Sequence, residues 1–329
     1  MSATKPPELA MLWEASDPHD ALRQRFGFTD AEEACQWLGV VLAKHWGFQV
    51  NSCERLVISA GNALAWLTTD AHRLVAKWSV VASLFPRLAE LARLTDWLAR
   101  RGLPVSGPVP ALDGSHQVKI DGVSLGLQEV VDGAHLDVTD QDQVYAAGGV
   151  LADLHLALAH YPDVTPVVAV SARRERQPLR VLMSRTIESC GRAVPATDAL
   201  RDWLDTAPPD HDLPVHLVHN DIRSANILCA GSTIRAVLDF EEVTLDHPVV
   251  DLAHGAVMLG TRFRNWGPVS PETHQAFIAG YQSRRRLSET EEAWLGALVL
   301  SGTLGFVRPG MEDPAGWTTS AHLAAEALR

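Results

Sequence analysis

The chain has 329 residues, of which 47% are hydrophobic and 21% are charged. That length suits one large core or two lobes. With 28 Lys and Arg residues against 40 Asp and Glu residues, the formal charge is −12. Such a charge disfavours nucleic acid and acidic membranes as partners and favours a cationic substrate, although it also serves solubility alone. The sequence shows no signal-peptide pattern and no apolar run long enough to span a membrane, so we expect a cytoplasmic protein.

The four cysteines lie far apart along the chain and form no C-x-x-C pair. This spacing argues against a zinc site and against a disulfide framework, and it fits a reducing compartment. The four positions are Cys35, Cys53, Cys190 and Cys229.

The first 28 residues carry three prolines and no clean hydrophobic period, so we expect a partly irregular leader. A capping-box pattern, Thr29 to Glu32, then precedes apolar residues at helical spacing. An amphipathic helix should follow and end at Gly47.

Residues 54–79 contain three apolar runs separated by two turn-like stretches, Ser59–Asn62 and Thr69–His72. This pattern predicts a three-stranded antiparallel meander. Lys77 stands among apolar residues in the third run, where its ammonium needs a partner or an anion. An edge-strand lysine with its head in water is the equal alternative.

The stretch from Pro86 to Arg101 has leucines at helical spacing and is ended by Gly102. On a helical projection Glu90 borders the leucine face and Asp96 lies opposite it. Glu90 is therefore the better partner for Lys77, although alone it would be a solvated glutamate.

Beyond residue 102 the pattern gives two strands, 117–120 and 124–131, and then mainly helices. One of these, 142–160, carries His155, which we expect to be structural. A basic run at 173–180 suggests a solvated helix start. If this run lines the substrate site instead, its positive charge would disfavour a polycationic antibiotic as the substrate. Its arginines are Arg173, Arg174, Arg176 and Arg180.

Two apolar runs, Ala225–Cys229 and Ile234–Phe240, flank the turn-like residues Ala230–Thr233 and predict a hairpin. If the turn is centred between residues 232 and 233, Asn226 faces Asp239 at the open end, with Cβ atoms roughly 5 Å apart. An amide oxygen beside a carboxylate is a natural site for Mg²⁺.

The residues around this hairpin carry a family resemblance. His219–Asp221, Asn226 and Asp239–Phe240 resemble the H-x-D-x-x-x-x-N and D-F-x elements of the protein-kinase-like fold. Asp246–Ala253 resembles the G-D-P-x-x-D-L-A run of the aminoglycoside phosphotransferase and homoserine kinase-like family. Without these spacings the stretch would be an ordinary hairpin with polar ends. Asp251 is implied to brace the catalytic loop, although it also fits a helix N-cap.

The resemblance covers roughly residues 50–260 and implies an α+β, bilobal protein-kinase-like fold. It has a small N-lobe, with an antiparallel sheet and one key helix, and a larger, mainly helical C-lobe. We expect a leader at 1–28, the N-lobe at 29–131 and the C-lobe at 132–329.

The resemblance also implies roles for the residues of the catalytic loop and hairpin. Asp221 would accept or orient the proton of the substrate hydroxyl, with His219 supporting the loop from behind. Asn226 and Asp239 would hold Mg²⁺. Arg223 would reach the γ-phosphate or, equally, be a surface arginine.

In the N-lobe, Lys77 paired with Glu90 would bind the nucleotide α- and β-phosphates. Backbone N–H groups of the first turn would cradle phosphate, through Ser59, Gly61 and Asn62. This turn departs from the protein-kinase glycine-rich loop, because Gly61 is its single glycine.

Residues 128–133 have the look of the hinge of this fold, where an extended strand meets the adenine edge. Glu129 and Val131 are its expected contacts.

The resemblance implies an ATP-dependent or GTP-dependent, Mg²⁺-requiring phosphotransferase acting on a small hydroxylated molecule, such as an antibiotic, an amino alcohol or a sugar. A Ser or Thr kinase acting on a peptide in natural-product biosynthesis is the rival within the class. A nucleotide-binding pseudokinase is the rival outside it, although all the required residues are intact. Glu241 and Glu242 stand where protein kinases have glycine, so no activation switch of that type is inferred. No motif identifies the acceptor pocket or the oligomeric state.

Overall fold

A computed structural model describes residues 6–171, 176–191, 194–263 and 266–328. The chain divides into two compact units, residues 1–131 and 132–329, which we describe separately. No helix in the described ranges is long and apolar enough to cross a membrane.

The first unit is a seven-stranded sheet with strand order β1-β2-β3-β4-β7-β5, in which β6 also pairs with β7. The pairing of β1 with β2 is parallel, whereas the other pairings are antiparallel. The strands are β1 (Glu8–Met11), β2 (Ser52–Ile58), β3 (Asn62–Thr68), β4 (Arg73–Ser79), β5 (Pro108–Val109), β6 (Val118–Ile120) and β7 (Val123–Glu129). The helices are α1 (Pro18–Ala21), the π-helix η1 (Leu22–Phe26), α2 (Ala31–Trp46), the 3-10 turn η2 (Ala82–Leu84) and α3 (Phe85–Ala99).

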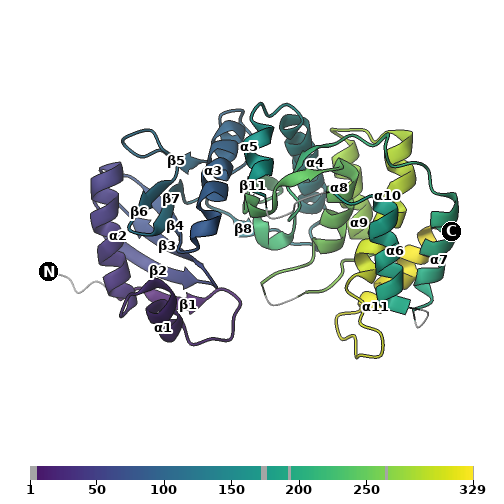
Figure 1. Cartoon of the computed structure of the whole chain (residues 1–329), viewed down its shortest axis with the longest axis horizontal. Coiled ribbons are helices and arrows are strands. Elements are labelled where there is room, and N and C mark those ends of the chain that lie inside the picture. Colours follow the sequence, from purple (N-terminus) through teal and green to yellow (C-terminus); the bar gives the residue numbers. More distant parts are fainter. Residues whose placement is uncertain (1–5, 172–175, 192–193, 264–265, 329) are drawn as a thin grey trace. The chain divides into compact units, whose positions relative to one another are not determined.

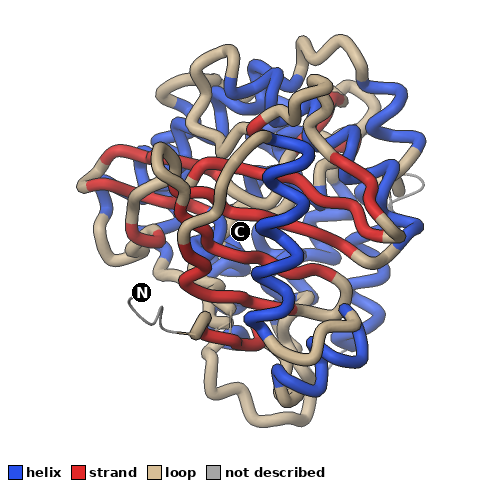
Figure 2. The backbone as a smooth tube through the Cα atoms, turned by 90° about the vertical axis from the view of Figure 1, so that its left-hand side faces the viewer, coloured by secondary structure: helices blue, strands red, loops and turns tan. Residues whose placement is uncertain are grey.

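Helix α2 lies across one face of this sheet, as the side view in Figure 2 shows. Its buried residues Leu38, Leu42 and Trp46 share a core with side chains of the central strands, including Leu56 and Trp78. The helix ends at Gly47 as predicted, with a left-handed φ of 74°. Burial of this apolar stripe fixes which face of each strand points inward.

The start of α2 differs by one residue from the capping box expected at Thr29. Asp30 is the N-cap, and its carboxylate accepts the N–H of Glu33 at 2.9 Å. The Glu33 carboxylate in turn accepts the backbone N–H of Thr29 at 2.6 Å. The reciprocal hydrogen bonds at the helix start therefore form one residue later than predicted. The sequence allowed either position, because Glu32 and Glu33 each lie three residues after a possible N-cap.

The N-terminal segment is more ordered than the irregular leader expected from its prolines. Residues 8–11 form β1, and Asp17 caps the short helix α1 by accepting the N–H groups of His19 and Asp20. Pro18 stands at the first helical position, where a proline is favourable. The segment thus extends the sheet of the first unit.

The cysteine expectation is also corrected, because Cys35 and Cys53 form a disulfide that joins α2 to β2. The argument from spacing considered only local C-x-x-C pairs. Packing of α2 on the sheet brings together two residues that are 18 positions apart. Cys190 and Cys229 are buried thiols.

The second unit is mainly helical, with two small sheets of order β11-β10-β8 and β12-β9. Its helices are α4 (Gln141–Leu158), α5 (Val164–Ala169), α6 (Leu179–Cys190), α7 (Ala196–Thr206), α8 (Pro248–Met258), α9 (Pro271–Gln282), α10 (Glu289–Leu304) and α11 (Trp317–Leu328). Its strands are β8 (Ala134–His135), β9 (His216–Val218), β10 (Ile227–Ala230), β11 (Thr233–Val237) and β12 (Thr244–Asp246). The 3-10 turns η4 (Ser224–Asn226) and η5 (Phe240–Glu242) flank the hairpin.

Helices α4 and α9 pack backbone to backbone within this unit, as seen for the labelled helices in Figure 1. Gly280 permits the contact, because a Cβ there would meet the carbonyl oxygen of Tyr145 at 1.9 Å. A second core joins α6, α7, α10 and α11 to α8. On α8, Gly255 also lies against Phe277 of α9, where an added Cβ would meet the ring at 3.3 Å. Helix α8 therefore packs against both groups of helices.

Candidate active site

The catalytic loop follows β9 and is fixed by one buried carboxylate. Asp251, in the first turn of α8, is completely buried and accepts the backbone N–H groups of His219 and Asn220, each at 2.9 Å. Asn220 has a left-handed φ of 64°, a conformation that is uncommon for residues other than glycine. The bidentate acceptor holds this bend in place.

The Asp251 carboxylate also belongs to a chain of buried side-chain hydrogen bonds that was not predicted from the sequence. His155 Nε2 lies 2.9 Å from Asp251 Oδ2, and His155 Nδ1 lies 2.8 Å from the hydroxyl of Tyr281. Burial alone would raise the pKa of Asp251, but above all the hydrogen bond from His155 holds that pKa below its usual value. Asp251 is therefore an anion, which suits a group that accepts backbone N–H bonds. In the sequence, the position of His155 within the predicted helix 142–160 indicated a structural role for this side chain.

His219 supports the loop with both ring nitrogens. Nδ1 accepts the backbone N–H of Asp221 at 3.2 Å, and Nε2 donates to the carbonyl of Leu238 at 3.1 Å. The ring is fully buried, and burial lowers its pKa. A neutral ring with its proton on Nε2 satisfies both contacts.

Asp221 lies on this loop, and the pKa of its carboxyl group is well above the value of an ordinary aspartate. Burial raises its pKa to about 6, with the charge of Asp239 adding to the rise, while Arg223 and the Asn226 hydrogen bond oppose it. Arg223 Nε lies 3.1 Å from Asp221 Oδ1, and Asn226 Nδ2 donates to Oδ2 at 2.7 Å. A carboxylate with such a pKa can accept a proton near neutral pH.

The hairpin register differs from the arithmetic by one residue. Strands β10 and β11 pair Ala230 with Thr233, but a bulge at Leu228 and Cys229 shifts the register towards the open end. The carbonyl of Asn226 consequently accepts the N–H of Leu238 at 2.8 Å, so Asn226 lies opposite Leu238. The turn is centred between Gly231 and Ser232, one residue earlier than assumed, which alone would place Asn226 opposite Val237. The bulge moves Asn226 one residue back towards Asp239.

Asp239 is the next residue and has a left-handed φ of 60° as the chain enters η5. The Asn226 amide donates its N–H groups to the backbone and side chain of Asp221, so its oxygen faces away as an acceptor. That oxygen and the Asp239 carboxylate fit Mg²⁺, which prefers oxygen ligands and retains waters. Within the described ranges, no three His, Cys, Asp or Glu side chains form a metal cluster.

In the first unit, the turn between β2 and β3 has its carbonyls occupied by internal donors. The Gly61 carbonyl accepts the Val80 N–H and the Ser79 hydroxyl, both at 3.1 Å. The Asn62 carbonyl accepts the Ser59 N–H at 2.9 Å. Ser59 therefore cannot offer its N–H to phosphate, as the sequence had suggested. A Cβ at Gly61 would meet Val81 Cγ2 at 2.3 Å, so this position requires glycine.

Lys77 lies on β4, a strand bordered by β3 and β7, opposite Leu64 and Gly126. Its neighbours Ala76 and Trp78 are buried in the core beneath α2. Because side chains alternate along a strand, Lys77 points to the other face of the sheet.

Glu90 lies on α3, and its carboxylate accepts a hydrogen bond from Arg93 Nε at 3.2 Å. Arg93 also pairs with Glu90 through its terminal nitrogen. Helical spacing alone indicates this i,i+3 pair. The pairing of Glu90 with Lys77 stays a prediction.

The expected hinge residues lie at the end of the first unit. Glu129 is the last residue of β7 and pairs with Leu74 of β4. Its exposed carboxylate lies 3.1 Å from His72 Nδ1. Val131 is the last residue of this unit.

The basic run is divided between described and undescribed residues. Arg173 and Arg174 lie outside the described residues. Arg176 contacts His247, and Arg180 donates to the carbonyl oxygens of Leu204, at 2.6 Å, and of Ala207. The described arginines thus tie down helix ends of the second unit.

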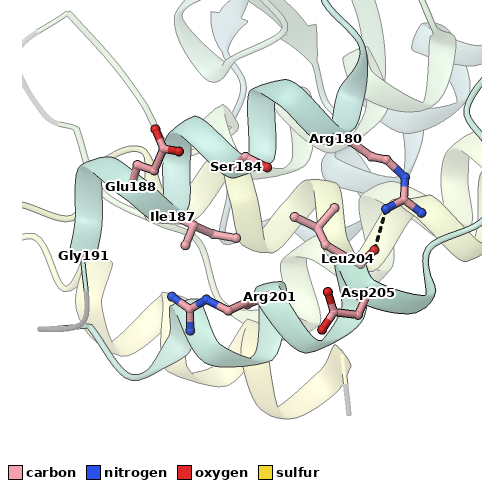
Figure 3. A pocket seen from close by; sticks show the side chains of 8 residues that line it. All are labelled: Arg180, Ser184, Ile187, Glu188, Gly191, Arg201, Leu204 and Asp205. Atoms are coloured by element: carbon pink, nitrogen blue, oxygen red, sulfur yellow. Dashed lines mark hydrogen bonds between the residues drawn. The ribbon is translucent and has the colours of Figure 1, made fainter.

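A surface pocket of about 520 Å³ lies between α6 and α7 (Figure 3). In this view Arg180 lies at one end, beside Leu204, and Glu188 and Gly191 lie at the other. Its lining residues are Arg180, Ser184, Ile187, Glu188, Gly191, Arg201, Leu204 and Asp205. None of these belongs to the catalytic loop or the hairpin.

Comparison with known proteins shows which family the chain resembles. A model described as the phosphotransferase enzyme family matches residues 53–293. Homoserine kinase from Neisseria meningitidis serogroup B is 26% identical over 245 residues, covering 74% of this chain and 78% of that protein. Homoserine kinase from Beijerinckia indica is 28% identical over 222 residues, covering 67% of each chain.

Among solved structures, a macrolide 2′-phosphotransferase from Brachybacterium faecium matches with a TM-score of 0.58 and 18% identity, over 89% of this chain and 95% of that one. A microcompartment-associated aminopropanol kinase matches with a TM-score of 0.54 and 21% identity, again over 89% and 95%. These matches confirm the α+β, protein-kinase-like fold predicted from the sequence.

Proposed function

Because the chain belongs to the phosphotransferase enzyme family, we propose that it transfers the γ-phosphate of ATP to a hydroxyl group of a small molecule. It is a kinase with a hydroxyl acceptor. The nucleotide, the acceptor and the roles of individual residues are the parts that we propose.

The observation that carries this proposal is the tuned carboxylate of Asp221. Its pKa of about 6 lies close to neutral pH, and a general base is most effective when its pKa is near the working pH. The Asp251 carboxylate fixes the loop that carries it. In this role Asp221 accepts or orients the proton of the acceptor hydroxyl, which brings the oxygen into line for attack on phosphorus.

The neighbouring groups balance the charge of the transfer. Arg223 is held at Asp221 through Nε, which leaves the two terminal nitrogens of its guanidinium for a phosphate oxygen. Asn226 and Asp239 would hold Mg²⁺, whose charge offsets that of the nucleotide phosphates when it is bound. Lys77 and the turn between β2 and β3 would bind the phosphates of the donor.

For the acceptor, we place amino alcohols first. Relatives that match at least two thirds of this chain are homoserine kinases, and one structural relative is an aminopropanol kinase. The charge of −12 also favours a cationic amine near the protein surface. Macrolides and other hydroxylated antibiotics are the second group, because a structural relative is a macrolide 2′-phosphotransferase.

A transfer screen with γ-labelled ATP and Mg²⁺ tests the proposal. The acceptors are amino alcohols including homoserine, macrolides, aminoglycosides and a Ser- and Thr-containing peptide mixture. We expect transfer to one small-molecule class, with GTP substituted in parallel to set the donor preference. Asp221→Asn should abolish transfer, whereas Asp212→Asn, at an exposed carboxylate beside His211, should not. Transfer that survives Asp221→Asn unchanged would refute the assigned base, and tight ATP binding without any transfer would favour a nucleotide-binding module.

A further inference from the structure

We infer that Arg25, which precedes the family-matched region, is a positioning residue for the nucleotide phosphates because it holds the turn Ser59–Asn62 in its anion-binding form. The inference rests on the proposed function. The family match begins at residue 53, so nothing in that match assigns a role to the segment that carries Arg25.

The N-terminal segment reaches this turn twice. Strand β1 runs parallel to β2 as far as Ile58, and the N–H of Leu12 extends the pairing by donating to the Ile58 carbonyl at 2.9 Å. The chain then passes through α1 and η1 and returns with Arg25, whose Nη1 donates to the carbonyl of Ser59 at 3.1 Å. Two contacts from one segment therefore flank the start of the turn.

Arg25 is itself held in position by Glu14. The same Nη1 lies 2.6 Å from Glu14 Oε2, and both side chains are largely covered, with 28% and 20% of their surfaces exposed. A partly shielded ion pair of this kind is better fixed than one in open solvent. Since the two charges balance, the effect of Arg25 on the turn is mainly positional.

With Arg25 in place, the carbonyls of Ser59, Gly61 and Asn62 all accept hydrogen bonds from within the first unit. By contrast, the N–H groups of Ala60 and Gly61 have no acceptor in the part of the chain that the structure describes. A turn whose carbonyls are occupied while successive N–H groups stay available is a concave site for an anion. Arg25 supplies the charged donor of this set and orients the first carbonyl of the turn.

The test compares ATP with adenosine, which lacks the phosphates. Binding of each to the full-length protein is measured with Mg²⁺ for wild type, Arg25→Met and Arg25→Lys. Arg23→Met is the matched control, because Arg23 lies on the same π-helix and makes an exposed pair with Asp20 at 3.3 Å. Thermal unfolding of each variant checks that the fold is retained.

We expect Arg25→Met to weaken ATP binding roughly tenfold, as for loss of one charge-assisted hydrogen bond that organises the site. Adenosine binding should change less than about twofold, since adenosine lacks the phosphates that the turn is proposed to bind. Arg25→Lys should fall between, because an ammonium lacks the guanidinium fork. Amide hydrogen exchange at Ser59, whose N–H donates to the Asn62 carbonyl at 2.9 Å, should speed up in Arg25→Met alone.

Equal loss of ATP and adenosine binding would show a general structural role and overturn the inference. Unchanged ATP binding by Arg25→Met in a protein whose wild type binds ATP would overturn the inference and leave the proposed function standing. Failure of the wild type to bind ATP would overturn both.

Discussion

Replacing Arg223 with methionine should move the pH dependence of phosphoryl transfer in a calculable direction. Asp221 has a pKa of about 6, raised by burial and lowered by Arg223. An arginine in contact with an aspartate lowers its pKa by about one to three. Asp221 must be deprotonated to accept a proton, so loss of Arg223 should shift the acidic limb of kcat/KM upward by at least about one pH unit.

The size of the effect follows from the fraction of Asp221 that is ionised. With a pKa of about 6, about half is ionised at pH 6 and about nine-tenths at pH 7. With a pKa of about 7, these fractions fall to about one-tenth and one-half. Relative to its own alkaline plateau, Arg223→Met should thus lose about fivefold more activity than wild type at pH 6.

The assay is a pH profile of kcat/KM for the acceptor at saturating nucleotide, from pH 5 to pH 9. Nucleotide binding is measured over the same pH range, because Arg223 is also a proposed phosphate contact, so that the titration of ATP is separated from that of Asp221. Arg223→Lys keeps the positive charge and should shift the limb much less. Arg235→Met, at an exposed position on β11, is a control for loss of a surface arginine. An acidic limb that stays in place in Arg223→Met would refute the electrostatic account, as would an equal shift in Arg235→Met.

Three further outcomes are expected. Asp221→Asn should be inactive yet no less stable. The pKa of Asp221 in the folded protein is raised above the ordinary value of 3.8, so ionisation of this carboxyl lowers the stability of the wild type above about pH 6. Thermal unfolding of the variant at pH 8 without Mg²⁺ should therefore show a gain in unfolding free energy of at most about 3 kcal/mol. A lower melting temperature would contradict this. Asp239→Ala should raise the Mg²⁺ concentration needed for half-maximal transfer by roughly tenfold or more, whereas an unaltered Mg²⁺ titration would remove Asp239 from the metal site. Gly280→Ala should lower the melting temperature by several degrees because its Cβ would meet a backbone oxygen at 1.9 Å; Gly39→Ala, in α2 with open space around it, should be neutral or stabilising.

Much of the fold and of the candidate site was readable from periodicity and motif spacing, because both are local properties of the chain. The meander that carries Lys77 and the helix that carries Glu90 were located in this way. The hairpin was found too, but its register was wrong by one residue, since the hydrophobic pattern marks neither the turn centre, which lies between Gly231 and Ser232, nor the bulge at Leu228 and Cys229 that partly offsets this error.

Long-range partnerships were the part that the sequence did not reveal. The disulfide between Cys35 and Cys53 exists because α2 packs on the sheet, a tertiary event that spacing rules do not anticipate. The same holds for Arg25 at the Ser59 turn, which depends on a parallel pairing of β1 that three prolines had argued against. Each of these contacts joins segments whose proximity is decided only by the assembled core.

Helix α8 faces two ways, and this has a consequence for engineering and for divergence within the family. Asp251 on one side fixes the backbone of the catalytic loop. Val249, Ala253 and Val257 lie in the core shared with α6, α7, α10 and α11. A substitution that repacks these helices can shift α8 in the tightly packed core. A shift of α8 moves Asp251, and with it the loop that carries Asp221. A library of variants of this protein should therefore keep α8 and the core residues packed against it constant, so that the position of Asp221 is preserved.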